Sequence, residues 1–169
     1  MNQKEMPVFH YMRQFDAPRE LVFNAFATAE ALNQWWGPVD TQNNVMSFDF
    51  RPGGIFHYRM TDGSNIRYGR FIFGRIEPYE LLEFNNAFAD EQATVVPAFF
   101  DPLFPREIFY RMLFSERNGK TTITMTGAPV NTDPAGAAAF EALKDSMDQG
   151  FGASFDLLDK YLYHTLKQQ

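Results

Sequence analysis

A chain of 169 residues with 45% hydrophobic and 21% charged residues has the composition of a globular domain, which excludes a disordered or fibrous protein. The formal net charge is −6 with scattered basic residues, so we expect no nucleic-acid partner. Cysteine is absent, which excludes disulfides and thiolate chemistry and favours a cytoplasmic location. We predict one domain over residues 1–169, with no signal segment and no membrane span.

The first part of the chain predicts a strand followed by two short helices. Residues 8–15 mix β-branched and aromatic side chains without a helical signal, and this strand ends at Asp16. Asp16 can cap a helix that has Pro18 in its first turn and an apolar face over residues 21–26. A second short helix is expected from Ala29 to the Trp35-Trp36 pair.

Between residues 45 and 127 the hydrophobic period changes to two, with turn residues between the runs. This pattern predicts an antiparallel meander. Its clearest runs are residues 55–60, 68–76, 81–88, 108–114 and 121–126. In the last run Ile123 and Met125 alternate with threonines, so we expect one packed face and one wet face.

From Pro134 onward, apolar residues recur at helical spacing as far as Leu162, which predicts one long amphipathic helix capped by Thr132 or Asp133. The predicted fold class is therefore α+β. A curved antiparallel sheet of about six or seven strands wraps on the long C-terminal helix, and two short helices follow strand one.

Several short motifs occur in order along the chain. They are Ala17-Pro18-Arg19-Glu20-Leu21-Val22-Phe23, Trp35-Trp36-Gly37-Pro38, Arg51-Pro52-Gly53-Gly54, Phe88-Ala89-Asp90-Glu91, Gly119-Lys120-Thr121-Thr122 and Ser146-Met147-Asp148-Gln149-Gly150-Phe151. Together they resemble the START-like (SRPBCC) superfamily, and more narrowly its branch named for the activator of heat-shock protein 90 ATPase. In that branch a Trp is frequent at the position of Phe151.

This resemblance implies a helix-grip fold with a cavity between the sheet and the long helix. Across the superfamily such cavities hold lipids, sterols, polyketides and other apolar molecules, and no catalytic residues are shared. Co-chaperone activity belongs to members with an additional N-terminal domain, for which we expect no room in 169 residues.

The inward phase of the predicted sheet supplies a candidate ligand-binding wall, and each member can equally be plain core. The strand members are Phe56, Tyr58, Phe71, Phe73, Tyr110 and Met112, and they face Met147 and Phe151 of the helix. Trp35 and Trp36 either lie at the cavity mouth or hold the short helices onto the sheet.

Residues 89–106 form a long loop that is rich in proline and phenylalanine. Loops of this length in compact domains are often lids or binding elements. Phe99, Phe100 and Phe104 therefore either cover the cavity as a lid or pack against a second subunit in a homodimer.

The titratable residues indicate neither a metal site nor a cofactor, because His10, His57 and His164 are far apart in the chain. His57 and Arg111 are expected to face solvent, and Arg111 becomes an anion anchor if it points inward. Glu107 and Asp49 are named as candidate general acids solely from their polar positions on strands.

The first functional hypothesis is a domain that binds a small hydrophobic ligand in the cavity. The alternatives are a cyclase- or hydrolase-type enzyme that acts on an apolar carbonyl substrate, and a protein-interaction module that modulates chaperones. The enzyme requires at least two polar groups that converge on one cavity. The module requires exposed phenylalanines in the loop.

Overall fold

The computed structural model describes residues 6–37 and 40–168. Its strands are β1 (Phe9–Phe15), β2 (Gln42–Phe48), β3 (Ile55–Asp62), β4 (Asn65–Glu77), β5 (Leu81–Ala89), β6 (Ile108–Arg117) and β7 (Lys120–Pro129). Its helices are α1 (Arg19–Asn24), α2 (Ala29–Trp35), α3 (Pro134–Ala142) and α4 (Lys144–Lys167). Among these residues no helix is both long and apolar enough to cross a membrane.

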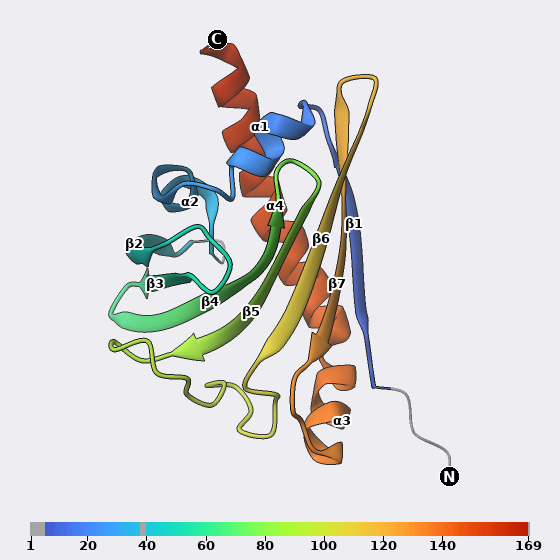
Figure 1. Ribbon diagram of the computed structural model, residues 1–169. Helices are drawn as coiled ribbons and strands as arrows, with labels where there is room; N and C mark the ends of the chain where they lie inside the picture. The colour runs from blue at the N-terminus through green and yellow to red at the C-terminus, as the bar shows by residue number, and fades with distance from the viewer. Residues whose placement is uncertain (1–5, 38–39, 169) are drawn as a thin grey trace.

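All seven strands join one antiparallel sheet in the order β1-β7-β6-β5-β4-β3-β2. The sheet curves, and α4 runs along its concave side with α1 and α2 beside its C-terminal half (Figure 1). The predicted helix-grip fold is confirmed. One layer is the sheet, the other is the long helix, and the core lies between them.

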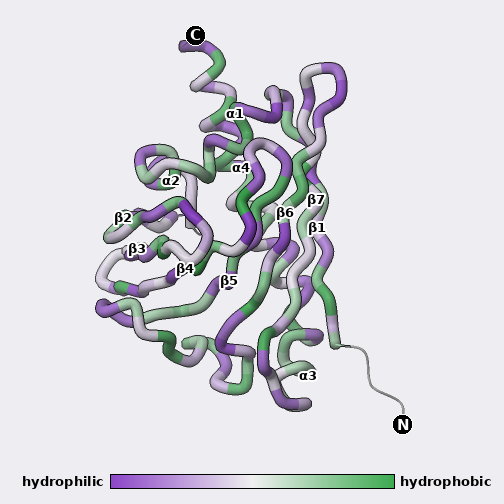
Figure 2. The backbone as a smooth tube through the Cα atoms, viewed as in Figure 1, coloured by the Kyte–Doolittle hydropathy of each residue, from purple (hydrophilic) through white to green (hydrophobic). Residues whose placement is uncertain are grey.

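The two-residue alternation along the strands positions this core. Figure 2 shows hydrophobic and hydrophilic residues alternating along the strands that face the helix. In β7, Ile123 and Met125 are buried, whereas Thr124 between them is exposed. The expected packed and wet faces are therefore confirmed, since a sheet covered on one side buries every second residue.

The start of α1 differs from the prediction. Pro18 occupies the N-cap position and no side chain caps the helix. Asp16 precedes that position by two residues, so the prediction that it caps the helix was wrong. α2 does have a side-chain cap, because Thr28 Oγ1 accepts a hydrogen bond from the Ala31 N–H at 3.2 Å.

The C-terminal region also differs, because it forms two helices instead of one. The chain leaves helical geometry at Leu143, with φ −102° and ψ 5°, and α4 begins at the next residue. The spacing of apolar residues continues across this break, so the pattern did not reveal it. The predicted cap is confirmed at Asp133, whose Oδ1 accepts from the Gly136 N–H at 2.7 Å.

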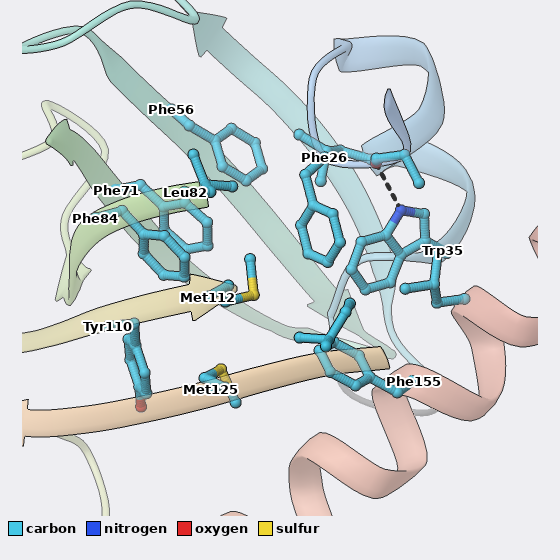
Figure 3. Close-up of a cluster of buried hydrophobic side chains, with 14 of the residues drawn as sticks. Phe26, Trp35, Phe56, Phe71, Leu82, Phe84, Tyr110, Met112, Met125 and Phe155 are labelled. Carbon is cyan, nitrogen blue, oxygen red and sulfur yellow. Dashed lines mark hydrogen bonds between the residues drawn. The ribbon is translucent and has the colours of Figure 1, made fainter. Parts of the chain in front are cut away.

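Aromatic rings form much of the core (Figure 3). Phe71 and Phe84 on neighbouring strands stack with centroids 4.1 Å apart at 10°. The edge of Trp35 meets Phe26 at 4.9 Å, and its indole N–H donates to the Ala25 carbonyl at 2.9 Å. These contacts lock the end of α2 onto the core beside Phe155 of α4.

A charged contact ties the middle of α4 to the edge strand β1. Arg13 Nη1 donates to the Gly152 carbonyl at 3.0 Å, and Nη2 pairs with Asp156 at 2.7 Å. The C-terminal half of α4 buries Phe155, Leu158 and Leu162. Its first half is only partly buried and borders open space instead of packed core.

Candidate functional site

A cavity of about 620 Å³ lies between the inner face of the sheet, the first half of α4 and the end of the Phe-rich loop. Its size falls within the roughly 300–1,000 Å³ of small-molecule pockets. Eight residues of the predicted wall and lid line it. They are Trp36, Tyr58, Phe99, Phe100, Phe104, Tyr110, Met147 and Phe151.

The other predicted wall residues take part in the core and are not among the described residues that line the cavity. They are Trp35, Phe56, Phe71, Phe73 and Met112, and each is buried. The strand phase was right for the four that lie on strands, and Trp35 ends α2. Among the strand residues, position along the strand separates those in the packed core from those that line the cavity, because the helix covers only part of the concave face.

The adjacent tryptophans have different environments. Trp35 is 1% exposed and holds α2 in the core. Trp36 is half-buried, and its ring meets Tyr58 and Phe71 edge to face at 6.0 and 5.1 Å. Its indole N–H is buried without a hydrogen-bond partner among the described residues. Trp36 thus forms part of the cavity wall, and Trp35 holds the helix.

Two tyrosines line the cavity, and each lies over a glycine of the adjacent strand. Tyr58 pairs with Gly69 across β3 and β4, and Tyr110 pairs with Gly127 across β6 and β7. A Cβ atom on Gly69 would lie 2.5 Å from the Tyr58 ring tip, and one on Gly127 would lie 2.6 Å from the Tyr110 ring. The missing side chains therefore give the rings their space.

The Tyr58 hydroxyl takes part in a short polar chain. Asn86 Nδ2 donates to this hydroxyl at 3.2 Å and to the Arg70 carbonyl at 3.2 Å. Burial raises the pKa of Tyr58 to about 12, against smaller opposing effects of Asn86 and Trp36. Burial, and to a lesser degree nearby Tyr58, also raises the pKa of Tyr110. Both hydroxyls are therefore protonated and neutral at physiological pH.

The Phe-rich loop closes one side of the cavity. Phe99 lies under the Arg67 guanidinium at 3.4 Å, and Phe100 contacts Phe104 at 5.1 Å. The loop is tied to the outer face of the sheet by Arg70, which donates to the Ala93 carbonyl at 2.9 Å and pairs with Glu107 at 3.3 Å. Phe99 and Phe100 remain 60% and 47% exposed.

The titratable candidates lie outside the cavity. Glu107 pairs with Arg70, and Asp49 pairs with Arg51 at 2.7 Å. Arg111 is exposed as expected, and pairs with Glu83 at 2.8 Å. His57 was expected to face solvent, yet it is buried. The loop covers it, and its Nε2 lies 3.0 Å from the Asp90 carbonyl.

His10 and His164 are both exposed and belong to opposite ends of the chain. In the described ranges no three His, Asp or Glu side chains gather in a geometry that could hold a metal ion.

Sequence reasoning missed several lining residues, among them Asn86, Ile108 and Ser154. Asn86 left a detectable signal, because it occupies the inward phase of β5 between Phe84 and Phe88. A polar residue on an otherwise apolar strand face indicates a polar partner on that face. Here the partner is the Tyr58 hydroxyl.

An antiparallel sheet that curls around a long helix, with an apolar cavity between them, defines the helix-grip class of proteins. The chain belongs to the family described as activator of Hsp90 ATPase homolog 1-like protein, whose sequence profile matches residues 16–163. The resemblance found in the sequence is confirmed. No curated protein matches this chain.

Solved structures with the same fold cover nearly the whole chain. A protein from Mycobacterium smegmatis is 23% identical with a TM-score of 0.76, covering 95% of this chain and 93% of its own. A protein from Arthrobacter aurescens is 21% identical with a TM-score of 0.79, covering 97% and 90%. The AHSA1 protein from Silicibacter pomeroyi is 15% identical with a TM-score of 0.70, covering 94% and 99%. At these identities the similarity establishes the fold alone.

Proposed function

We propose that the protein binds a small hydrophobic molecule in the cavity between the sheet and α4. The observation that carries this proposal is about 620 Å³ of open space beneath the helix. Protein interiors otherwise pack as densely as organic crystals, so a purely structural core would leave no such space. The family's fold is of a kind used for ligand binding or for interaction.

The distribution of charge around the cavity supports an apolar ligand. Asp62 and Arg106 are exposed, and Arg67 stacks on the exposed ring of Phe99, so these charges belong to the mouth. Gly150 of α4 lines the cavity, and a Cβ atom there would meet nothing within 4 Å. The deeper wall is aromatic and uncharged, which suits an apolar ligand whose transfer out of water is favourable.

The arrangement supports binding more strongly than proton transfer. A general acid or base must lie within hydrogen-bond reach of the reacting group. Of the described residues that line the cavity, Asp62 is the one carboxylate, and no histidine joins it. Asp62 is exposed, where solvent would weaken its action on a ligand held deeper in the cavity.

Replacing Met147 by tryptophan tests the site. The larger side chain would occupy the cavity from the helix side, so we expect binding of the neutral fluorophore N-phenylnaphthylamine to weaken by about tenfold or more. Met12→Trp makes the same chemical change on the outer face of β1, where Met12 is 70% exposed, and serves as control. Fluorescence titration measures both, and circular dichroism checks folding. Equal binding by the two folded variants, or no binding by the wild type, would refute the proposal.

A second candidate function is association with another copy of the chain through the Phe-rich loop. Exposed apolar side chains favour it, because Phe99, Phe100 and Leu103 are 60%, 47% and 60% exposed. A cluster of this kind commonly marks an interaction surface. Leu103 distinguishes this candidate from a lid, because it is not among the described residues that line the cavity.

For this second candidate we expect Leu103→Glu to abolish a wild-type dimer in sedimentation velocity while probe binding stays unchanged. A buried, unpaired carboxylate at an interface is strongly unfavourable. Leu113→Glu is the matched control, because Leu113 is 45% exposed on β6 and pairs with Leu81, at the end of β5 opposite to the one from which the loop leaves. A wild type that sediments as a monomer at every concentration would exclude self-association.

A further inference from the structure

Two buried hydrogen-bond donors in the cavity have no acceptor among the described residues. The first is the Trp36 indole N–H, which is shielded from solvent and unpartnered. The second is the proton of the Tyr58 hydroxyl, because in its hydrogen bond with Asn86 this hydroxyl is the acceptor. Burying an unsatisfied donor is unfavourable, so both donors call for a partner that the described residues do not supply.

The orientation of the Asn86 amide determines whether the Tyr58 hydroxyl accepts or donates in the hydrogen bond between them. Asn86 Nδ2 faces the Arg70 carbonyl at 3.2 Å, and a carbonyl can only accept, so the amide nitrogen must lie on that side. The same nitrogen donates its second proton to the Tyr58 oxygen at 3.2 Å. Tyr58 is therefore the acceptor in this bond. Its own proton is left free to donate.

The two free donors are neighbours. The Trp36 and Tyr58 rings meet edge to face with centroids 6.0 Å apart, and both residues line the cavity. The Trp36 N–H is close enough to favour ionisation of the Tyr58 hydroxyl, but the contact falls short of a hydrogen bond. Both groups are held in place, Tyr58 over Gly69 and Trp36 against Phe71.

We propose that the ligand carries a carbonyl oxygen of the ketone or aldehyde kind, and that the Trp36 N–H and the Tyr58 O–H bind this oxygen. The inference rests on the proposed ligand-binding function. A carbonyl oxygen has two lone pairs and no proton, so it satisfies two donors without requiring an acceptor in return.

A charged oxygen fits this end of the cavity less well. A buried carboxylate needs a cation or several donors. Arg67 and Arg106, the described cations that line the cavity, belong to its mouth. With a pKa of about 12, Tyr58 remains a neutral donor at physiological pH.

The test compares two probes in four proteins. The probes are the naphthalene ketone prodan and its counterpart in which a propyl chain replaces the propionyl group. The proteins are the wild type, Tyr58→Phe, Trp36→Phe and the control Tyr163→Phe, which makes the same change at a residue of α4 that is 55% exposed and is not among the described residues that line the cavity. We expect the wild type to bind the ketone about tenfold more tightly than the propyl counterpart, because the ketone gains hydrogen bonds in a site shielded from water.

Tyr58→Phe and Trp36→Phe should each lose most of that preference, measured as the ratio of the two affinities so that a general change of the cavity wall cancels. Tyr163→Phe should retain it. The carbonyl stretching frequency of bound prodan should be lowered in the wild type and rise in Tyr58→Phe, a change that a purely structural role of the ring would not produce.

The outcomes separate this inference from the proposed function. Equal affinity of the wild type for the ketone and its propyl counterpart would mean that water satisfies the donors. It would overturn the carbonyl anchor while leaving a hydrophobic site. The same conclusion follows if both variants keep the ketone preference. Failure of both probes to bind to the folded wild type would instead refute ligand binding in the cavity.

Discussion

Replacing Trp35 by alanine is expected to lower the free energy of unfolding by about 3–5 kcal/mol, the usual loss for truncating a large buried aromatic residue. The indole of Trp35 is 1% exposed and packs against Phe26, Trp36 and Phe155. Truncation also leaves the Ala25 carbonyl without its donor. Urea unfolding followed by circular dichroism measures the loss.

The stability loss of Trp35→Ala is compared with that of Trp36→Ala. Trp36 borders an existing cavity and is half-buried, so its removal enlarges open space instead of creating a new void. We expect less than half the loss of stability, together with a larger loss of probe binding than in Trp35→Ala. Equal destabilisation by the two alanine substitutions would contradict the separate roles of these neighbours.

A second large effect is expected for Gly69→Ala. The added methyl group would lie 2.5 Å from Cζ and from the hydroxyl of Tyr58, well inside van der Waals contact. The ring must move into the cavity and give up its hydrogen bond from Asn86. Overpacking of this kind costs about 1–3 kcal/mol. We expect probe binding to weaken as well, because the displaced ring occupies ligand space.

Gly74→Ala is the matched control on the same strand, because a methyl group there would lie 3.4 Å from the Glu83 Cβ, an ordinary contact. We expect its stability to stay within about 0.5 kcal/mol of the wild type. Adding Tyr58→Leu to Gly69→Ala removes the ring tip, so the double variant should lose less stability than the two single losses added together. Simple additivity would show that the steric conflict lies elsewhere.

Much of the fold could be predicted because its signals are local. Alternation in the run that contains Ile123 and Met125 identified the buried face of its strand, and helical spacing up to Leu162 identified the C-terminal helix. The motifs around Pro18 and Trp35 supported the family. Errors occurred at ends and breaks. Apolar periodicity does not reveal the loss of helical geometry at Leu143, and Asp16 had the right chemistry two residues too early.

The candidate site was predictable only in part. The phase of a strand determines which side chains face the helix, so Tyr58 and Phe56 were both correctly expected on the inner face. Whether an inner residue meets packed core or open space depends on where the helix, the loop and the neighbouring strands end. No local pattern carries that information.

The sequence by itself determined the aromatic interior, the antiparallel meander, the long helical segment and the family to which the chain belongs. Only the tertiary structure decided that Trp35 belongs to the core and Trp36 to the cavity, that Gly69 gives Tyr58 its space, and that Asn86 leaves the Tyr58 proton free. Each of these depends on contacts between residues that are distant in the chain, or on adjacent side chains that point in different directions. Such contacts arise from packing and hydrogen-bond geometry, which periodicity along the sequence does not encode.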